Sequence, residues 1–318
     1  MEKLDNLISL LEKNNIHFSQ HVALAPKSTF KIGSTCSVFI APESMDIFQL
    51  SLKLLISTDV PFYMLGGGSN TVFPDTNYDG VIISTENLKQ IEIVSEDDTT
   101  VSIRCMAGTP ISNFVNFCTA NCYSGVEQFA GLPGSVGGAV YMNARCFNKS
   151  INEVFEKASY ITPDTAEIKE ITYNKNEWAY KVSPFQPKGG SGLIEIHKYV
   201  LSATFKLTKI NTDKKIEIEN ECKKYINERV SKGHFKYPSA GSVFKNNRSF
   251  GKPSGQLIDE AGLRGYKIGG AQVAPFHGNF IINVDHATQN DIKQIVKKVI
   301  ETVKEKTTFT LECEIIFL

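Results

Sequence analysis

The chain has 318 residues and a mass of 35.3 kDa, which is long enough for a substantial core and predicts two or three domains. Its 34 basic and 34 acidic side chains cancel, so no general positive field would hold nucleic acid, and no apolar run is long enough to cross a membrane. Seven scattered cysteines, with no Cys-x-x-Cys, are typical of reduced thiols rather than of a disulfide framework or a zinc site. The start of the chain lacks the pattern of an export signal, so we expect a soluble cytoplasmic protein.

Strand and helix patterns alternate over the first 125 residues. The first expected helix has an apolar stripe of Leu4, Leu7, Ile8 and Leu11. A second begins at Pro42–Glu43, with Ile47, Leu50 and Leu54 on its inward face. A third is capped by Thr109–Pro110 and carries Ile111, Phe114, Val115 and Cys118. The expected strands cover residues 28–33, 38–41, 61–65, 81–84 and 101–106. This alternation predicts an α+β or α/β domain that binds a cofactor.

Strand patterns then dominate as far as residue 207, with segments at 158–161, 168–173 and 199–207. A polar stretch at 210–215 is the expected domain boundary, and a charged helix is predicted over 216–231. A second helix is capped by Thr288 with Asp291, and its apolar side chains are Ile292, Ile295, Val296, Val299, Ile300 and Val303. Residues 308–318 are predicted to form a closing strand.

Two glycine-rich loops are the most informative feature of the sequence. The first, Leu65–Asn70, follows an apolar strand pattern, and the second, Glu127–Ala144, contains four glycines around Pro133. Such loops expose backbone N–H groups to an anionic ligand and let it approach closely, which favours a phosphate-bearing cofactor over two structural turns. Neither loop has the spacing of a Rossmann or P-loop motif.

Further motifs follow in a fixed order along the last third of the chain. They are Tyr237–Asn246 (YPSAGSVFKN), Gly255–Gly265 (GQLIDEAGLRG), Ile268–Val273 (IGGAQV), His277–Asn283 (HGNFIIN) and Leu311–Ile315 (LECEI). Together with both glycine loops, this order resembles the UDP-N-acetylenolpyruvoylglucosamine reductase (MurB) family of peptidoglycan synthesis, from about Thr29 to the C-terminus. The short last third is similar to the second type of this reductase.

The resemblance implies an α+β chain with an FAD-binding module of the vanillyl-alcohol-oxidase (PCMH) type over residues 1–209, in two subdomains that meet near 80–85. A substrate domain over 210–307 and a C-terminal strand over 308–318 would follow. The FAD would bind residues of both loops: Leu65, Gly66, Gly67, Gly68, Ser69, Asn70, Gly131, Pro133, Gly134, Val136, Gly137, Gly138, Ala139 and Asn143.

The implied reaction takes electrons from NADPH to FAD and then reduces the enolpyruvyl group of UDP-N-acetylglucosamine enolpyruvate to a lactyl ether, giving UDP-N-acetylmuramate. Flavin N5 would deliver hydride to C3, and Ser242, which matches the proton donor of the family, would protonate C2. Lys245 is a nearby cation that would steady the serine alkoxide. Taken alone, Ser242 is better interpreted as a turn serine after Gly241, and the surrounding motif favours the catalytic interpretation. Glu314 matches the acidic residue of the family and must be neutral or charge-paired to act. The alternative, an ordinary edge-strand acid, suits Glu312 better than Glu314.

Three positions depart from the pattern of the family. Tyr180-Lys181-Val182-Ser183 stands where the family has Tyr-Arg-x-Ser, so Lys181 would bind the substrate carboxylate with a point charge and without the two-point grip of arginine. Arg145 replaces a usual glycine and Asn247 a usual proline.

The resemblance also implies that the nucleotide sugar binds Tyr180, Arg229, Lys232, Lys245, Asn246 and His277. His277 is equally a packing residue, and Lys232 stands before Gly233-His234 where the family has Gln-Pro. His17 and His21 are four residues apart but have no third ligand nearby, so no metal is expected.

Two other functions remain open. One is a flavin oxidoreductase of the same fold with another substrate, and the other is a UDP-sugar binder without activity. We expect a monomer or weak oligomer that uses FAD and NADPH and contacts neither nucleic acid nor membrane.

Overall fold

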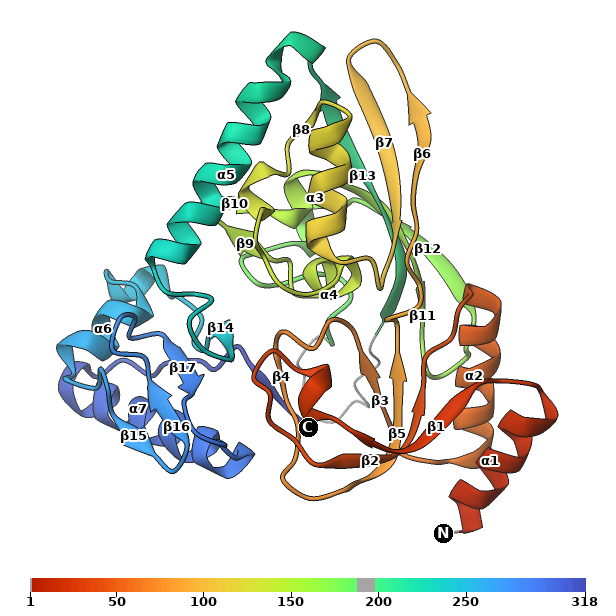
Figure 1. Ribbon diagram of the computed structural model, residues 1–318, viewed down its shortest axis with the longest axis horizontal. Helices are drawn as coiled ribbons and strands as arrows, with labels where there is room; N and C mark the ends of the chain where they lie inside the picture. Colours follow the sequence, from red (N-terminus) through yellow and green to blue (C-terminus); the bar gives the residue numbers. More distant parts are fainter. Residues whose placement is uncertain (1, 188–197) are drawn as a thin grey trace. The chain divides into compact units, whose positions relative to one another are not determined.

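The computed structural model describes residues 2–187 and 198–318, and the chain divides into two compact units built from interleaved segments (Figure 1). Unit 1 comprises Met1–Gln20, Val38–Gly67 and Gly80–Ile226. Unit 2 comprises His21–Ser37, Gly68–Asp79 and Asn227–Leu318. Each unit therefore combines stretches that are far apart in the sequence.

A twisted antiparallel sheet organises most of unit 1. Its strand order is β12-β11-β13-β7-β6, with the short β8 also paired to β13. The strands are β6 (Ile91–Glu96), β7 (Thr100–Met106), β8 (Tyr123–Ser124), β11 (Phe155–Ile161), β12 (Ile168–Thr172) and β13 (Tyr199–Lys209). Helix α3 (Ile111–Ala120) packs on this sheet through Phe114, whose ring centroid lies 4.7 Å from that of Phe205 in β13. All four apolar residues predicted for the inner face of α3 are buried, as expected from their helical spacing.

Two neighbouring helices, α1 (Glu2–Lys13) and α2 (Met45–Thr58), share a second core with the parallel strands β3 (Phe62–Leu65) and β5 (Tyr78–Ser84). Figure 1 shows α1 and α2 side by side. The four-stranded sheet to which β3 belongs has the order β1-β2-β5-β3, where β1 is Phe18–Ala23 and β2 is Thr35–Ile40. Strand β3 runs directly into the first glycine loop, so this sheet positions that loop.

The remaining elements of unit 1 are short, apart from α5 (Lys215–Ser231), which confirms the predicted charged helix and continues into the residues of unit 2. Helix α4 (Val136–Tyr141) begins within the second glycine loop and is followed by the hairpin β9 (Arg145–Cys146) and β10 (Lys149–Ser150). Single 3₁₀ turns occur in unit 1 at Glu127–Phe129, Ile151–Glu153, Lys175–Glu177 and Thr212–Lys214, and in unit 2 at Ala25–Lys27 and Arg248–Phe250.

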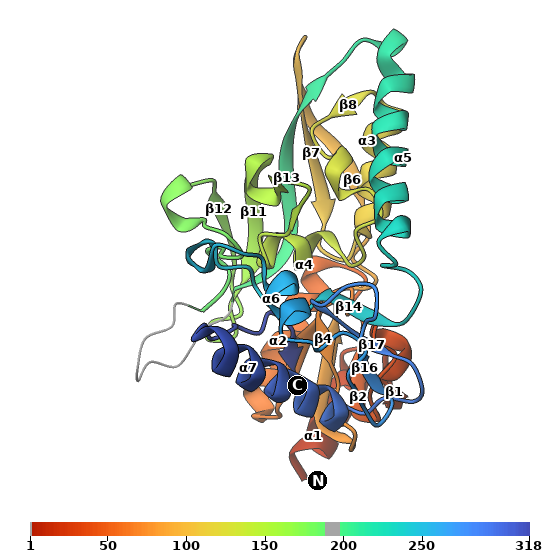
Figure 2. The same cartoon turned by 90° about the vertical axis from the view of Figure 1, so that its left-hand side faces the viewer.

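Unit 2 contains an antiparallel sheet of order β14-β17-β16-β15 and two helices that share its apolar core. The elements are β14 (Ser239–Ser242), β15 (Lys267–Ile268), β16 (Ala271–Val273), β17 (Phe280–Asn283), α6 (Ser254–Glu260) and α7 (Gln289–Thr307). Figure 2 shows α7 lying along this unit. The predicted capping box is present, because Thr288 accepts the N–H of Asp291 and the Asp291 carboxylate accepts the N–H of Thr288. A parallel pair of β18 (Ile316–Phe317) with β4 (Thr71–Val72) ties the C-terminal residues to the segment after the first glycine loop.

The structure corrects four local predictions. Residues 28–30 form a bend and a turn, residues 31–33 have no regular structure, and the strand begins at Thr35. Helix α2 begins after Ser44, whose hydroxyl accepts the N–H of Ile47, and its buried face is carried by Phe48, Leu52 and Leu55, whereas Ile47 is exposed. Thr109 does not cap α3, because its hydroxyl donates to the carbonyl of Gln90.

The fourth correction concerns the C-terminal segment. Residues 308–318 do not form one strand: Thr308 has a left-handed conformation, Cys313 makes an isolated bridge with Phe244, and only Ile316–Phe317 is a strand. The segment pairs first with Phe244 and then with β4. The spacing of apolar side chains along the sequence does not indicate which strand a segment pairs with. In the described residues, no helix is both long and apolar enough to span a membrane.

Candidate active site

The two glycine loops touch each other within unit 1. A Cβ atom on Gly67 would lie 2.6 Å from the Cα of Gly134, and one on Gly66 would lie 2.9 Å from the hydroxyl oxygen of Ser135. Both distances are shorter than carbon and oxygen atoms tolerate without displacement, so the backbones can approach only because these residues have no side chain. Gly134 also has a φ of +105°, which favours glycine for a separate reason.

Most N–H groups of the second loop are engaged within the protein. Ser135 caps α4 by accepting the N–H of Gly138, while Val136 donates to the carbonyl of Thr109 and Gly137 donates to that of Ala107 over 2.8 Å. These bonds fix the start of α4 firmly against the strand β7 and its following turn. The second loop therefore offers a close-packed surface rather than a row of donors.

The first loop supplies the donors instead. Among the described residues, none accepts a hydrogen bond from the backbone N–H groups of Gly66 and Gly67 in unit 1, or from those of Gly68 and Ser69 in unit 2. Gly68 has a φ of +62°, and a Cβ there would lie 1.9 Å from the carbonyl oxygen of Lys27. Consecutive backbone N–H donors in a glycine-rich segment can bind the oxygens of a pyrophosphate. These residues therefore fit a dinucleotide such as FAD.

The other predicted cofactor residues lie around these loops. Leu65 is the buried end of β3, Gly131 has a φ of +74°, and Ala139 is buried in α4, while Pro133 stands in the turn before it. In unit 2, the side chain of Asn70 donates to the backbone carbonyl of Glu314 over 3.0 Å, and its own carbonyl accepts the N–H of Ile316. The end of the first loop is thus bound to the C-terminal segment that carries Glu314.

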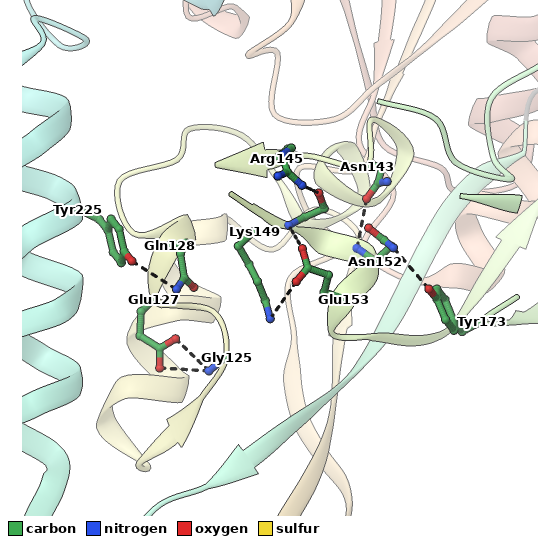
Figure 3. Close-up of polar contacts among 11 residues, drawn as sticks. Gly125, Glu127, Gln128, Asn143, Arg145, Lys149, Asn152, Glu153, Tyr173 and Tyr225 are labelled. Carbon is green, nitrogen blue, oxygen red and sulfur yellow. Dashed lines mark hydrogen bonds and ion pairs between the residues drawn. The ribbon is translucent and has the colours of Figure 1, made fainter. Parts of the chain in front are cut away.

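Asn143 makes contacts within the protein (Figure 3). Its side chain is 2% exposed, its Oδ1 accepts the N–H of Asn152 at 3.2 Å, and its Nδ2 donates to the carbonyl of Ala179 at 2.8 Å. Asn143 also has a φ of +40°. Its amide therefore links the end of the second glycine loop to the turn that carries Lys181.

Lys181 lies in a two-residue turn. Ala179 and Val182 exchange both backbone hydrogen bonds, which leaves Tyr180 and Lys181 at the tip, and Lys181 has a left-handed φ of +58°. The turn is anchored at its ends by Asn143 and by Ser183, whose hydroxyl donates to the carbonyl of Tyr141 over 2.6 Å. At the tip Tyr180 is exposed and Lys181 is half-buried, and the turn that carries them has a fixed base.

Arg145 lies on β9, beyond the glycine loop. Its guanidinium donates to the hydroxyl of Ser150 over 3.0 Å, and Lys149 and Glu153 pair nearby at 3.6 Å (Figure 3). The departure from glycine at this position is therefore accommodated by a hairpin that gives the charge a polar partner.

Ser242 and Glu314 lie on adjacent segments of unit 2. The N–H of Glu314 donates to the carbonyl of Val243 at 2.7 Å, and the N–H of Lys245 donates to the carbonyl of Glu312 at 2.9 Å, so residues 243–245 and 312–314 form a short antiparallel ladder. Ser242 is exposed and Glu314 is half-buried. Two residues separated by 71 intervening positions in the sequence are therefore fixed near each other by backbone hydrogen bonds.

Two further predicted residues of this motif have protein partners. Lys245 forms an ion pair with Glu312 at 2.5 Å. Asn246 accepts the N–H of Ser254, in the first turn of α6, at 2.9 Å. Because Glu312 partly neutralises the charge of Lys245, this lysine would stabilise a Ser242 alkoxide less than a lone cation would.

The remaining predicted ligands gather around a pair of histidines in unit 2. The ring centroids of His234 and His277 are 6.2 Å apart, and each ring packs on Phe280 at about 4.5 Å. Burial, followed by the charge of Arg229, lowers the pKa of His234 to about 4, and burial also lowers the pKa of His277. Both imidazoles are therefore neutral at pH 7, and His277 uses Nδ1 to accept the N–H of Asn279.

Arg229 is buried at the end of α5, and Lys232 forms an ion pair with Glu228 at 2.5 Å. The described residues contain no group of three or more side chains arranged to hold a metal ion. Sequence reasoning missed His234 and Asn279, because a histidine between a glycine and a phenylalanine and an asparagine inside an apolar motif carry no signal of their own. Only the fold shows what they contact.

Comparisons with known proteins agree with this architecture. The model of the FAD binding domain matches residues 36–170, and the model of the UDP-N-acetylenolpyruvoylglucosamine reductase C-terminal domain matches residues 233–318. The fold and these matches define a flavin-dependent oxidoreductase whose cofactor is FAD, with mixed α+β architecture, as the resemblance implied.

Relatives identify the family. The UDP-N-acetylenolpyruvoylglucosamine reductase of Treponema denticola is 44% identical, with 99% of this chain and 98% of that protein covered, and the one of Borrelia garinii subsp. bavariensis is 39% identical, with 99% and 97% covered. The crystal structure of the reductase from Thermus caldophilus has the same fold, with a TM-score of 0.73, 24% identity, and 95% and 98% coverage. The chain belongs to the UDP-N-acetylenolpyruvoylglucosamine reductase family, which confirms the resemblance drawn from its motifs.

Proposed function

We propose that the chain reduces UDP-N-acetylglucosamine enolpyruvate to UDP-N-acetylmuramate in peptidoglycan synthesis, with NADPH as the electron donor. The observation that carries the proposal is the backbone ladder that holds Glu314 beside the residue after Ser242. FAD, when bound, supplies the hydride that the double bond accepts. The protein has to hold the nucleotide sugar, spread the negative charge that develops beside the carboxylate, and donate one proton.

Each of these tasks suits a described residue. Ser242 is exposed at the end of β14 and would donate its hydroxyl proton to C2. Lys181, at the tip of its anchored turn, would bind the substrate carboxylate with one positive charge. Glu314 would act protonated or paired, because an ionised carboxylate would oppose the charge that develops on the substrate.

The nucleotide part of the substrate would bind Tyr180, Arg229, Lys232, Lys245, Asn246 and His277, and the FAD would bind the two glycine loops. A buried cation such as Arg229 and a half-buried neutral imidazole such as His277 suit a diphosphate and a uracil. We further propose a cytoplasmic monomer or weak oligomer without nucleic-acid or membrane contacts, and segments at 1–209, 210–307 and 308–318 for cofactor, substrate and Glu314.

The test uses the two half-reactions separately. The purified protein should absorb in the flavin bands, NADPH should bleach it in the absence of air, and UDP-N-acetylglucosamine enolpyruvate should restore the colour. Ser242→Ala and Glu314→Gln should still bleach but should regain colour about 10²–10⁴ times more slowly, as expected for the loss of a group that acts in proton transfer.

Ser249→Ala and Glu305→Gln are matched controls, since they remove an exposed hydroxyl and an exposed carboxylate elsewhere in unit 2. Colour restored by oxygen and not by the enolpyruvyl substrate would indicate another flavin oxidoreductase. A colourless protein that binds the nucleotide sugar would indicate a binding protein, and either result would refute the proposal.

A further inference from the structure

Strand β14 changes its partner immediately after Ser242. Up to Ser242 it pairs with β17, where Ser239 faces Ile282 and Ser242 faces Phe280, so three steps along β14 correspond to two along β17. This extra residue is a β-bulge, and Gly241 within it has a φ of +73°. From Val243 onward the chain pairs instead with residues 312–314.

Asn279 holds this exchange of partners. Its backbone carbonyl accepts the N–H of Val243 at 2.9 Å. Its side chain is equally engaged, because Oδ1 accepts the N–H of Phe244 at 2.8 Å and Nδ2 donates to the carbonyl of Phe244, also at 2.8 Å. The side-chain amide thus acts as one peptide unit of a neighbouring strand, with donor and acceptor both matched.

The position of this amide matters because no strand of the described residues pairs with Phe244 on that side. The hydrogen bonds of the 312–314 ladder are made by its neighbours Val243 and Lys245, so the N–H and carbonyl of Phe244 point the opposite way, toward Asn279. Asn279 is 3% exposed and Phe244 is 2% exposed, so water does not replace these bonds. Leaving a buried peptide group unpaired is unfavourable, so loss of the amide would favour displacement of this segment.

We propose that Asn279 is a positioning residue that fixes the direction of the Ser242 hydroxyl relative to Glu314 through the backbone of Val243 and Phe244. The inference rests on the proposed function, in which Ser242 donates the proton. In this proposal, Asn279 does not contact the substrate but aligns the group that transfers the proton. The rate of such a transfer is sensitive to displacements of an ångström or less.

The test compares Asn279→Ala with Asn283→Ala. Asn283 is the last residue of β17, which Asn279 immediately precedes, and its side chain also makes two bonds to backbone. It donates to the carbonyl of Phe30 at 3.0 Å and accepts the N–H of Ala287 at 2.9 Å, and neither bond involves Val243 or Phe244. We expect both variants to lose comparable stability and both to be bleached by NADPH at the wild-type rate. Only Asn279→Ala should be reoxidised by the enolpyruvyl substrate more slowly, about 10–100-fold, and with a larger solvent deuterium isotope effect because proton transfer has become limiting.

Asn279→Asp gives a second readout that a merely structural role would not produce. The protonated carboxyl has the shape of the amide and can both donate to and accept from Phe244, whereas the carboxylate can only accept. Relative to wild type at each pH, which removes the titration of His277 from the comparison, reoxidation of this variant should recover as the pH falls.

A flat ratio with pH, together with Asn279→Ala at the wild-type reoxidation rate or slowed equally with Asn283→Ala, would overturn the inference. If wild type itself is not reoxidised by the enolpyruvyl substrate, the proposed function fails first. If wild type is reoxidised and Ser242→Ala is not, but Asn279→Ala behaves as wild type, only the role of Asn279 fails.

Discussion

The backbone N–H of Glu314 donates to the carbonyl oxygen of Val243 over 2.7 Å, which places the C-terminal acid one residue away from the strand position of Ser242. The bond joins two backbones, so it fixes the positions of the two Cα atoms and does not use either side chain. Strand β14 brings Ser242 to this point through a bulge, and Asn70 holds the opposite side of Glu314 by donating to its carbonyl. The arrangement is therefore sensitive to backbone changes that leave the reactive side chains intact.

Gly241→Ala should test that sensitivity. A Cβ at Gly241 meets no atom within 4 Å, so the only cost is the positive φ of +73°, about 1–2 kcal/mol for an L-residue. Gly262 has a φ of +77° and the same open surroundings at the end of α6. Chemical unfolding should show equal destabilisation by Gly241→Ala and Gly262→Ala, while only Gly241→Ala should slow reoxidation by the enolpyruvyl substrate. Equal reoxidation rates would show that the bulge does not align Ser242.

Replacing Lys181 with arginine should strengthen binding of the substrate carboxylate. Lys181→Ala removes the charge and should slow reoxidation by the enolpyruvyl substrate about 10–100-fold, with flavin reduction by NADPH unchanged, because a hydrogen bond to a charged group contributes about 1.5–3 kcal/mol. Lys181→Arg adds a second donor in a planar fork and should lower the KM for that substrate about tenfold, equivalent to ~1.4 kcal/mol. Lys175, which is exposed on a neighbouring turn, provides the matched Ala and Arg controls. Wild-type kinetics in both Lys181 variants would remove this residue from the site.

Gly67→Ala should release FAD by separating the two glycine loops. The added Cβ would stand 2.6 Å from the backbone of Gly134 and 2.7 Å from the nitrogen of Ser135, and backbone cannot yield as a flexible side chain can. The ratio of flavin to protein absorbance in the purified variant should fall well below that of wild type. Gly138→Ala places its Cβ at an ordinary 3.5 Å from Ser135 Oγ and should retain far more flavin. Full flavin content in Gly67→Ala would mean that the loops do not need this contact.

Stability should fall on mild acidification because of His234. Its pKa is about 4 in the folded protein and about 6.5 in an unfolded chain, so between these values the unfolded chain binds a proton that the folded protein lacks. The free energy of unfolding therefore decreases as the pH falls through this window, and the contribution of His234 levels off below about 4. Because the ring is partly exposed, we expect a loss of about 1 kcal/mol between pH 7 and pH 5 in urea unfolding. His234→Gln should reduce that loss and His17→Gln should not; an unchanged pH dependence in His234→Gln would assign it elsewhere.

Local patterns in the sequence correctly predicted the elements whose caps and buried faces are formed by residues close together in the sequence. The spacing of Ile111, Phe114, Val115 and Cys118 predicted the buried face of α3, and Thr288 with Asp291 predicted the start of α7. Where two patterns competed, prediction failed by a few residues: Pro42 is a common first residue of a helix, but Ser44 supplies the hydroxyl that caps α2. The predicted inward face also differed, because Phe48, Leu52 and Leu55 are fully buried, whereas Leu50 and Leu54 are only partly buried and Ile47 is exposed.

By itself, the sequence determined the family, the FAD cofactor and the residue types of the candidate site, because glycine loops and ordered motifs are read directly from residue identity. Tertiary structure decided which groups contact each other: the approach of Gly67 to Gly134, the placing of Glu314 next to Val243, and the use of the Asn279 amide as a missing strand partner. These relationships depend on hydrogen bonds and close packing between segments that are distant along the chain. Such contacts leave no periodic or local signal, because either partner alone is compatible with many neighbours.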